Sequence, residues 1–176
     1  MGPVALQHLT VRDASRLMQQ PMDDQRQGMQ SAFIAQAYGA APVPDTASPD
    51  MSVLLHLLWR MKWDNAYKAV YWRLMVDGLP KFRPVRPCPC GMTHADDQPA
   101  SPDRMHVMWQ CGVAQAVVAE MHAALAAAGI LVTLSVVDVW LMRPPQGVHA
   151  GLWRVVCLAA VNAMLHGHRR LQRLHG

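Results

Sequence analysis

The stretch that decides the fold is CPCGMTHADDQPASPDRMHVMWQC, which runs from Cys88 to Cys111 and holds three of the four cysteines. Cys88 and Cys90 form a C-x-C pair, and after fifteen intervening residues His106 and Cys111 form an H-x4-C pair. Three thiolates and one imidazole are a tetrahedral ligand set typical of structural Zn²⁺, and this clustering suits a metal better than disulfides. The sequence therefore predicts one structural zinc ion held by Cys88, Cys90, His106 and Cys111.

The spacing of the first cysteine pair leaves the ligand set open. Zinc knuckles usually have C-x2-C spacing, whereas only Pro89 separates Cys88 from Cys90. His94 is therefore a rival ligand, and ordinary buried or free cysteines remain a further alternative. Gly91 favours a metal site that includes both Cys88 and Cys90, because glycine permits a tight turn in which backbone N–H groups point at sulfur.

Composition predicts a globular chain with long connectors. Hydrophobic residues make up 52% of the 176 residues and charged residues 16%, which excludes a disordered chain, while 13 prolines and 11 glycines indicate loops. The net charge of +4 favours polyanionic partners only weakly, because 12 acidic residues offset 16 basic ones. A nucleic-acid surface must therefore come from local clustering of charge.

Apolar residues at helical spacing indicate a mainly α fold, an irregular helical domain with a zinc-stapled, proline-rich loop between helices. The expected organisation is an N-terminal helical segment over residues 1–39, a linker over 40–50 and a zinc-binding helical domain over 51–176. Caps and helix breakers place the helices of that domain near residues 51–61, 65–78, 113–129, 135–142 and 148–174.

The sequence predicts neither a membrane span nor secretion. The longest apolar stretches, 113–137 and 151–165, are interrupted by charged and polar residues, and the first twenty residues lack a signal-peptide core. Because a metal rather than a disulfide framework explains the cysteines, the expected compartment is intracellular and reducing, either the nucleus or an organelle.

Several segments around the cysteines carry a family resemblance. They are VYWRLMVDGLP, CPCG, RMHVMWQCGVAQAVVAEM and the late helix with Trp153, Arg169 and Arg170. In this order, over about residues 51–174, they resemble the zinc-binding domain at the C-terminal end of non-LTR retrotransposon reverse transcriptases, most of all retroelement-derived versions in green algae. The resemblance implies a zinc-stabilised module that contacts nucleic acid, most naturally RNA, and accompanies a polymerase without performing its chemistry.

Basic residues interleaved with aromatic residues near the zinc loop suit single-stranded RNA, because rings stack on bases while cations neutralise phosphate. The aromatic residues include Trp59, Trp63 and Tyr67. The structural alternative is that aromatic residues at helical spacing belong to the hydrophobic core and that the surface cations are only solvated. The candidate nucleic-acid contacts are Lys68, Arg73, Lys81, Arg83 and Arg86.

Two other functions compete with nucleic-acid binding. One is a protein-interaction or scaffold subunit of a ribonucleoprotein such as an organellar ribosome, with zinc only fastening helices. The burial or exposure of Trp59, Trp63, Trp109 and Trp153 distinguishes this scaffold from a nucleic-acid binder. The other is a metal-dependent hydrolase that uses His94 at a vacant coordination position. The sequence shows no phosphate loop, catalytic triad or carboxylate pair, so no enzymatic activity is expected.

Overall fold

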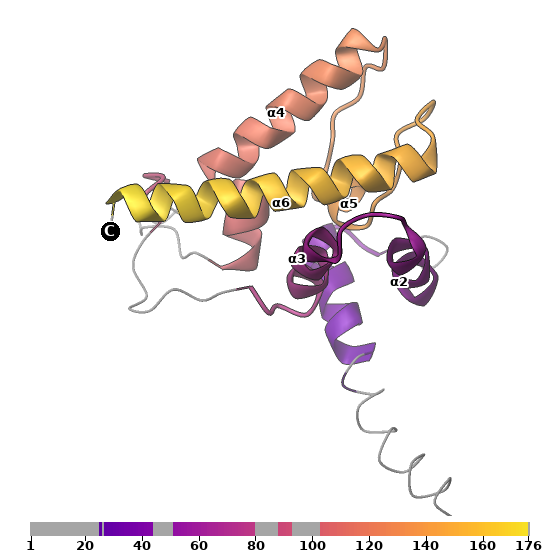
Figure 1. The fold of residues 1–176 in the computed structure, drawn as a ribbon, viewed down its shortest axis with the longest axis horizontal. Helices are drawn as coiled ribbons and strands as arrows, with labels where there is room; N and C mark the ends of the chain where they lie inside the picture. The colour runs from indigo at the N-terminus through magenta and orange to yellow at the C-terminus, as the bar shows by residue number, and fades with distance from the viewer. Residues whose placement is uncertain (1–24, 26, 44–50, 80–87, 93–102, 176) are drawn as a thin grey trace, which may run out of the picture.

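A computed structural model describes residue 25 and residues 27–43, 51–79, 88–92 and 103–175. Regular structure within these ranges is helical, without a β-strand, which confirms the predicted mainly α class. Apart from residues 88–92, the predicted proline-rich loop lies outside the described ranges. Figure 1 shows a helix over residues 27–38, then α2 (Met51–Arg60), α3 (Asn65–Met75), the π-helical turn η2 (His106–Gln110), α4 (Gly112–Ala127), α5 (Val136–Trp140) and α6 (Ala150–His175).

The long helix α6 is the element against which α4, α3 and η2 pack (Figure 1). Trp153, Cys157, Val161, Met164 and Leu165 are buried and recur mostly every three or four residues, which is the apolar stripe of an amphipathic helix. By length and composition α6 is apolar enough to cross a bilayer, but 44% of its most apolar window is buried inside the protein. Packing against α3 and α4 accounts for the buried part of this apolar surface.

Local signals in the sequence set several helix ends, as predicted. Asp64 begins α3 by accepting a hydrogen bond from a backbone N–H of the first turn. Ser135 begins α5 in a reciprocal capping box with Asp138. Gly129 follows the end of α4 with a φ of 77°, a left-handed conformation that glycine adopts without strain. Asp50, whose residue type and place just before Met51 indicate the cap of α2, lies outside the described residues.

Three buried aromatic residues join the helix over residues 27–38 to the rest of the core. Phe33 stacks on Trp140 with ring centroids 5.4 Å apart and meets Tyr71 edge-on at 6.4 Å. The Tyr71 hydroxyl donates to the Trp140 carbonyl at 2.6 Å, so the polar tip of this buried ring is satisfied. The helix that the sequence assigns to an N-terminal segment thus shares a core with α3 and α5.

The helices α4 and α6 approach closely at one end and diverge at the other. A Cβ atom at Gly167 would lie 2.5 Å from Cγ1 of Val113, so the absence of a side chain at Gly167 permits the close approach. Away from Cys111 the two helices diverge (Figure 1) and border an apolar groove of about 760 Å³. Its lining includes Val117, Met121, Leu125, Val148, Leu152 and Val156.

Candidate metal centre

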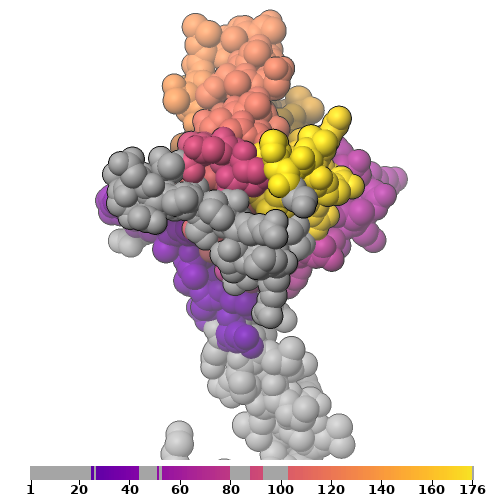
Figure 2. All heavy atoms as spheres, turned by 90° about the vertical axis from the view of Figure 1, so that its left-hand side faces the viewer, coloured from indigo at the N-terminus to yellow at the C-terminus, as the bar shows by residue number. Residues whose placement is uncertain are grey.

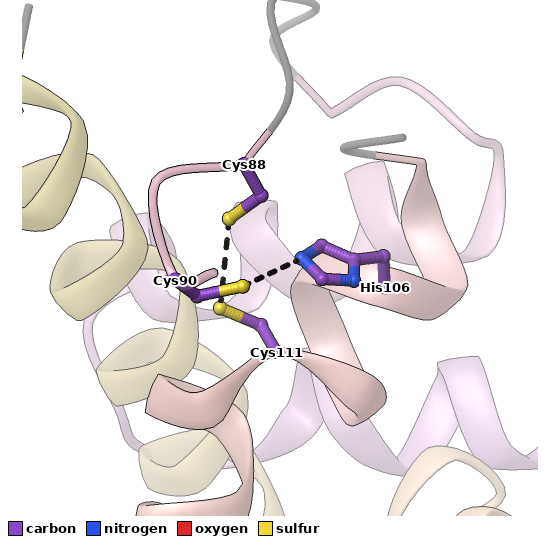
Figure 3. Close-up of side chains that lie close together, drawn as sticks. All are labelled: Cys88, Cys90, His106 and Cys111. Carbon is purple, nitrogen blue, oxygen red and sulfur yellow. Dashed lines mark hydrogen bonds between the residues drawn. The ribbon is translucent and has the colours of Figure 1, made fainter. Parts of the chain in front are cut away.

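Four side chains meet at the point that the sequence predicts. One ligand atom from each of Cys88, Cys90, His106 and Cys111 lies within 4.8 Å of the others (Figure 3). The Sγ atoms of Cys88 and Cys111 are 3.9 Å apart, and Sγ of Cys90 is 3.4 Å from Nε2 of His106. The usual zinc bond lengths give tetrahedral edges of about 3.8 Å between two sulfurs and about 3.5 Å between sulfur and nitrogen. The four residues therefore lie close enough to hold one metal ion.

The π-helical turn η2 explains how His106 and Cys111 reach the same ion. Residues five apart in an ordinary α-helix point about 140° away from each other. In η2 the Cys111 N–H instead donates to the His106 carbonyl at 2.6 Å, closing a wider turn of five residues. This wider turn brings the imidazole and the thiol to one side of the chain. Cys111 then stands at the N-terminal end of α4, where partial positive charge favours a thiolate.

The short Cys-Pro-Cys spacing is accommodated by a tight turn. Gly91 has a φ of 75°, and its N–H lies 3.4 Å from the Cys88 carbonyl oxygen, to which it donates. Backbone N–H groups point at sulfur, as the sequence predicts for a glycine at this position. Each sulfur accepts an N–H from the residue two positions later: Cys90 for Cys88, Met92 for Cys90 and Val113 for Cys111.

Burial and hydrogen bonding make the three thiols unequal. Burial raises the pKa of Cys88 to about 12 and also raises the pKa of Cys111. Burial acts in the same direction at Cys90, but hydrogen bonds from the Met92 amide and neighbouring donors outweigh it and lower the pKa. Cys88 and Cys111 are buried and Cys90 is half-buried. Binding of a metal ion to these residues would release protons, because metals bind the thiolate form.

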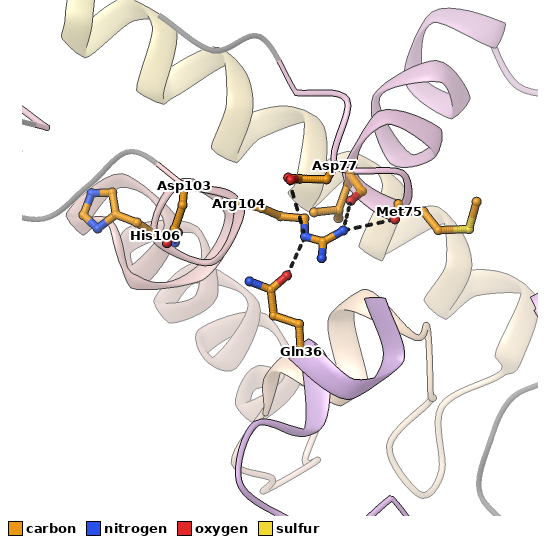
Figure 4. A network of polar contacts seen from close by, with 7 residues as sticks. Gln36, Met75, Asp77, Asp103, Arg104 and His106 are labelled. Atoms are coloured by element: carbon orange, nitrogen blue, oxygen red, sulfur yellow. Dashed lines mark hydrogen bonds and ion pairs between the residues drawn. The ribbon is translucent and has the colours of Figure 1, made fainter. Parts of the chain in front are cut away.

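Two residues that precede His106 fix the start of its turn. The side chain of Asp103 accepts the His106 N–H at 2.7 Å. The guanidinium of Arg104 donates to Oε1 of Gln36 at 2.6 Å and to the carbonyls of Leu74 and Met75 at 3.0 Å each (Figure 4). Arg104 therefore links the metal centre to the C-terminal end of α3 and to the helix over residues 27–38.

A fifth residue, His168, adjoins the centre and was not predicted from the sequence. In the sequence, His168 stands apart from the cysteines near the end of the last predicted helix, which indicates a surface or helix-end residue. In the structure it is fully buried on α6, with Nε2 3.4 Å from Sγ of Cys88. Burial, with a smaller effect of His106, lowers the pKa of His168 to about 4, so the ring is neutral near pH 7. Figure 2 shows the segment over residues 88–92 (magenta) against the C-terminal end of α6 (yellow).

The predicted nucleic-acid contacts have different outcomes. Lys68 is a wrong prediction, because its side chain is buried and Nζ donates to the carbonyls of Trp59 and Met61 at 3.2 and 2.7 Å. Lysine at this position therefore closes the C-terminal end of α2 instead of facing a partner. Arg73 is exposed, as a contact requires, and its role stays a prediction. The remaining candidates, Lys81, Arg83 and Arg86, and the rival ligand His94 lie outside the described residues.

The aromatic residues divide between core and surface. Trp153 is buried in the core of the chain and donates from Nε1 to the Asp138 carbonyl at 2.9 Å. Trp63 and Trp109 are half-buried, whereas 45% of Trp59 is exposed. Aromatic periodicity in the sequence does not reveal this division, because core and surface rings share the same helices.

Comparison of the chain with protein-family models, with curated proteins and with solved structures finds no match. The resemblance to the zinc-binding domain of reverse transcriptases therefore depends on the sequence segments alone. The geometry of the four side chains is independent of that resemblance.

Proposed function

We propose that this chain is a non-catalytic module whose helices are fastened by one structural zinc ion. The observation that carries the proposal is the convergence of Cys88, Cys90, His106 and Cys111, with sulfur–sulfur and sulfur–nitrogen distances near those of a tetrahedral zinc site. Zinc suits three thiolates and an imidazole better than Mg²⁺ or Ca²⁺, which prefer oxygen. A four-residue shell leaves no open position for a catalytic water, which favours a structural role over hydrolysis.

Metal analysis of the purified full chain tests this proposal. We expect one zinc ion per chain, retained through gel filtration, and uptake of one Co²⁺ with strong sulfur-to-cobalt charge-transfer absorption after zinc removal. All four cysteines are free of disulfides in the structure, so each ligand thiol is available. A chain that folds fully, contains no metal and takes up neither ion would contradict the proposal.

We further propose that the module binds single-stranded nucleic acid, most naturally RNA, in line with the family resemblance. The supporting observation is an aromatic–basic patch at the turn between α2 and α3, formed by Trp59, Arg60, Lys62, Trp63 and Tyr67. Trp59 and Tyr67 are 45% and 39% exposed, and Arg60 and Lys62 are exposed beside them in the sequence. Exposed rings accompanied by cations are the surface chemistry that base stacking and phosphate neutralisation require.

The patch is also held in place, which lowers the entropy cost of binding. Buried Lys68 bonds the Trp59 carbonyl, and its Nζ lies 5.9 Å from the centroid of the Trp59 ring. Trp63 and Tyr67 meet edge-on at 5.7 Å, so the two rings support each other. A preorganised ring loses little freedom when a base stacks on it.

Removing the charges of Arg60 and Lys62 is expected to weaken RNA binding and its dependence on salt. For the double variant Arg60→Gln and Lys62→Gln, the slope of log affinity against log salt should fall by about 1.4 if both cations contact phosphate. Replacing Trp59 by Ala should cost about 1–3 kcal/mol of binding free energy with little change in slope. The measurement is fluorescence anisotropy with single-stranded RNA at several salt concentrations.

The matched control removes the same two charges at Arg143→Gln and Arg173→Gln, outside the patch. This variant is expected to keep most of the native chain's slope of log affinity against log salt. Equal effects of the two double variants, or no RNA binding by the native chain, would remove the patch from consideration.

The scaffold alternative is favoured by a different observation, the apolar groove between α4 and α6. Leu152 borders this groove and is 59% exposed, as an apolar anchor for a protein partner would be. Loss of RNA binding in the Trp59 variant supports the nucleic-acid function, whereas a native chain indifferent to RNA favours the scaffold.

A further inference from the structure

The buried histidine at the edge of the metal centre has no role in the ligand set proposed above. His168 comes from α6, whereas the four proposed ligands come from the segment over residues 88–92 and from the region of η2. Its Nε2 lies 3.4 Å from Sγ of Cys88, within hydrogen-bonding distance of sulfur. The side chain is fully buried, so the contact does not compete with bulk water.

With a metal ion bound, the centre carries a net charge that hydrogen-bond donors would stabilise. Three thiolates, a neutral imidazole and a divalent ion carry one net negative charge. Cys88, His106 and Cys111 are at most 5% exposed, so this charge is largely removed from water. Burying a charge is costly unless hydrogen bonds compensate for the lost hydration. The sulfurs of the centre therefore require N–H donors from the protein.

The donors are distributed unevenly among the three sulfurs. Cys90 accepts the N–H groups of both Met92 and Gly112. Cys111 accepts the Val113 N–H and stands at the N-terminal end of a sixteen-residue helix, whose dipole favours negative charge. Cys88 accepts the N–H of Cys90, and the imidazole of His168 lies within hydrogen-bonding distance of its sulfur.

We propose that His168 is a positioning residue of the metal centre, which donates its Nε2–H to the Cys88 thiolate and so ties α6 to the ion. The inference depends on the proposed zinc site. Partners of ligand atoms orient the ligands and raise metal affinity, and α6 supplies one from the far end of the chain. Binding of the ion and docking of the last turns of α6 then stabilise each other.

The packing of α6 supports this assignment. Gly167, the residue before His168, is the position where a Cβ would meet Val113 at 2.5 Å. The backbone N–H of Val113 in turn donates a hydrogen bond to the sulfur of Cys111. The close approach of α6 to α4 at Gly167 thus lies one residue before His168, whose Nε2 is 3.4 Å from Sγ of Cys88.

The experiment compares His168→Leu, which removes the donor, with His168→Gln, whose side-chain amide keeps an N–H at a similar reach. Zinc affinity of the full chain is measured by competition with a chromophoric chelator. We expect His168→Leu to bind zinc about 10- to 100-fold more weakly than the native chain, and His168→Gln to lie within about threefold of it. The visible spectrum of the Co²⁺ form should be that of three sulfurs and one nitrogen in all three proteins.

A second measurement follows the end of α6 directly. Zinc should slow amide hydrogen exchange in residues 165–174 of the native chain and of His168→Gln, and slow it less in His168→Leu. Equal zinc affinity of His168→Leu and the native chain would overturn the inference. A changed cobalt spectrum in both variants would also overturn it, because His168 would then be a ligand. Failure of the zinc proposal itself appears separately, as a native chain that binds no metal.

Discussion

Replacement of Cys111 by serine is expected to abolish stoichiometric zinc binding and to remove the stability that zinc confers. Cys111 is fully buried and joins η2 to α4, so its thiolate connects the ion to both helical elements. Zinc at a thousandfold excess over its dissociation constant would stabilise the native chain by about 4 kcal/mol. For a domain of this size the melting temperature should fall by roughly 10 °C when that contribution is lost.

Cys157→Ser is the matched control, because it makes the same chemical change at a buried thiol outside the centre. Its zinc content should remain at one ion per chain. Differential scanning calorimetry with zinc and with a chelator measures both variants. The zinc-dependent shift in melting temperature should persist in Cys157→Ser and disappear in Cys111→Ser. A shift that survives in Cys111→Ser would show that zinc acts elsewhere on the chain.

The parts of the structure that sequence could predict are those governed by local signals. Asp64, Ser135 and Gly129 act through backbone groups within a few residues, so caps and helix ends follow from residue type. The ligand set followed from the chemistry of thiolates and imidazole at short spacing. The π-helical turn was not predicted, although five residues from His106 to Cys111 match its i to i+5 hydrogen bond.

The residues that sequence analysis misplaced are those whose role depends on packing between distant segments. Lys68 has the composition of a surface cation, but its stem is buried and its ammonium bonds carbonyls at the end of α2. His168 lies 80 residues from Cys88 in sequence, and nothing near it in the chain identifies a metal centre. Only the path of α6 past residues 88–92 brings the two together.

Replacement of Arg104 by methionine is expected to destabilise the chain by about 2–4 kcal/mol, because several buried carbonyl and amide groups would lose their donor. The guanidinium donates hydrogen bonds to Gln36, Leu74 and Met75 (Figure 4). Its central carbon also lies 5.4 Å from the Phe33 ring centroid. Burial lowers the pKa of Arg104, and nearby carboxylates oppose this change, so the side chain remains charged. Urea denaturation in the presence of zinc measures the loss.

Two controls separate the hydrogen-bond network from charge. Asp77 lies 3.9 Å from Nε of Arg104 and its side chain is 55% exposed, so Asp77→Asn should cost less than about 1 kcal/mol. Asparagine also tolerates the left-handed backbone at this position, where φ is 52°. Arg170→Met, an exposed site on α6, should change the free energy of unfolding by at most about 0.5 kcal/mol. If Arg104→Met were as stable as Arg170→Met, the carbonyls at the end of α3 would not depend on Arg104. The metal centre would then be joined to the aromatic core mainly by contacts between η2 and Trp140. Nε1 of Trp140 donates to the Met108 carbonyl at 3.3 Å.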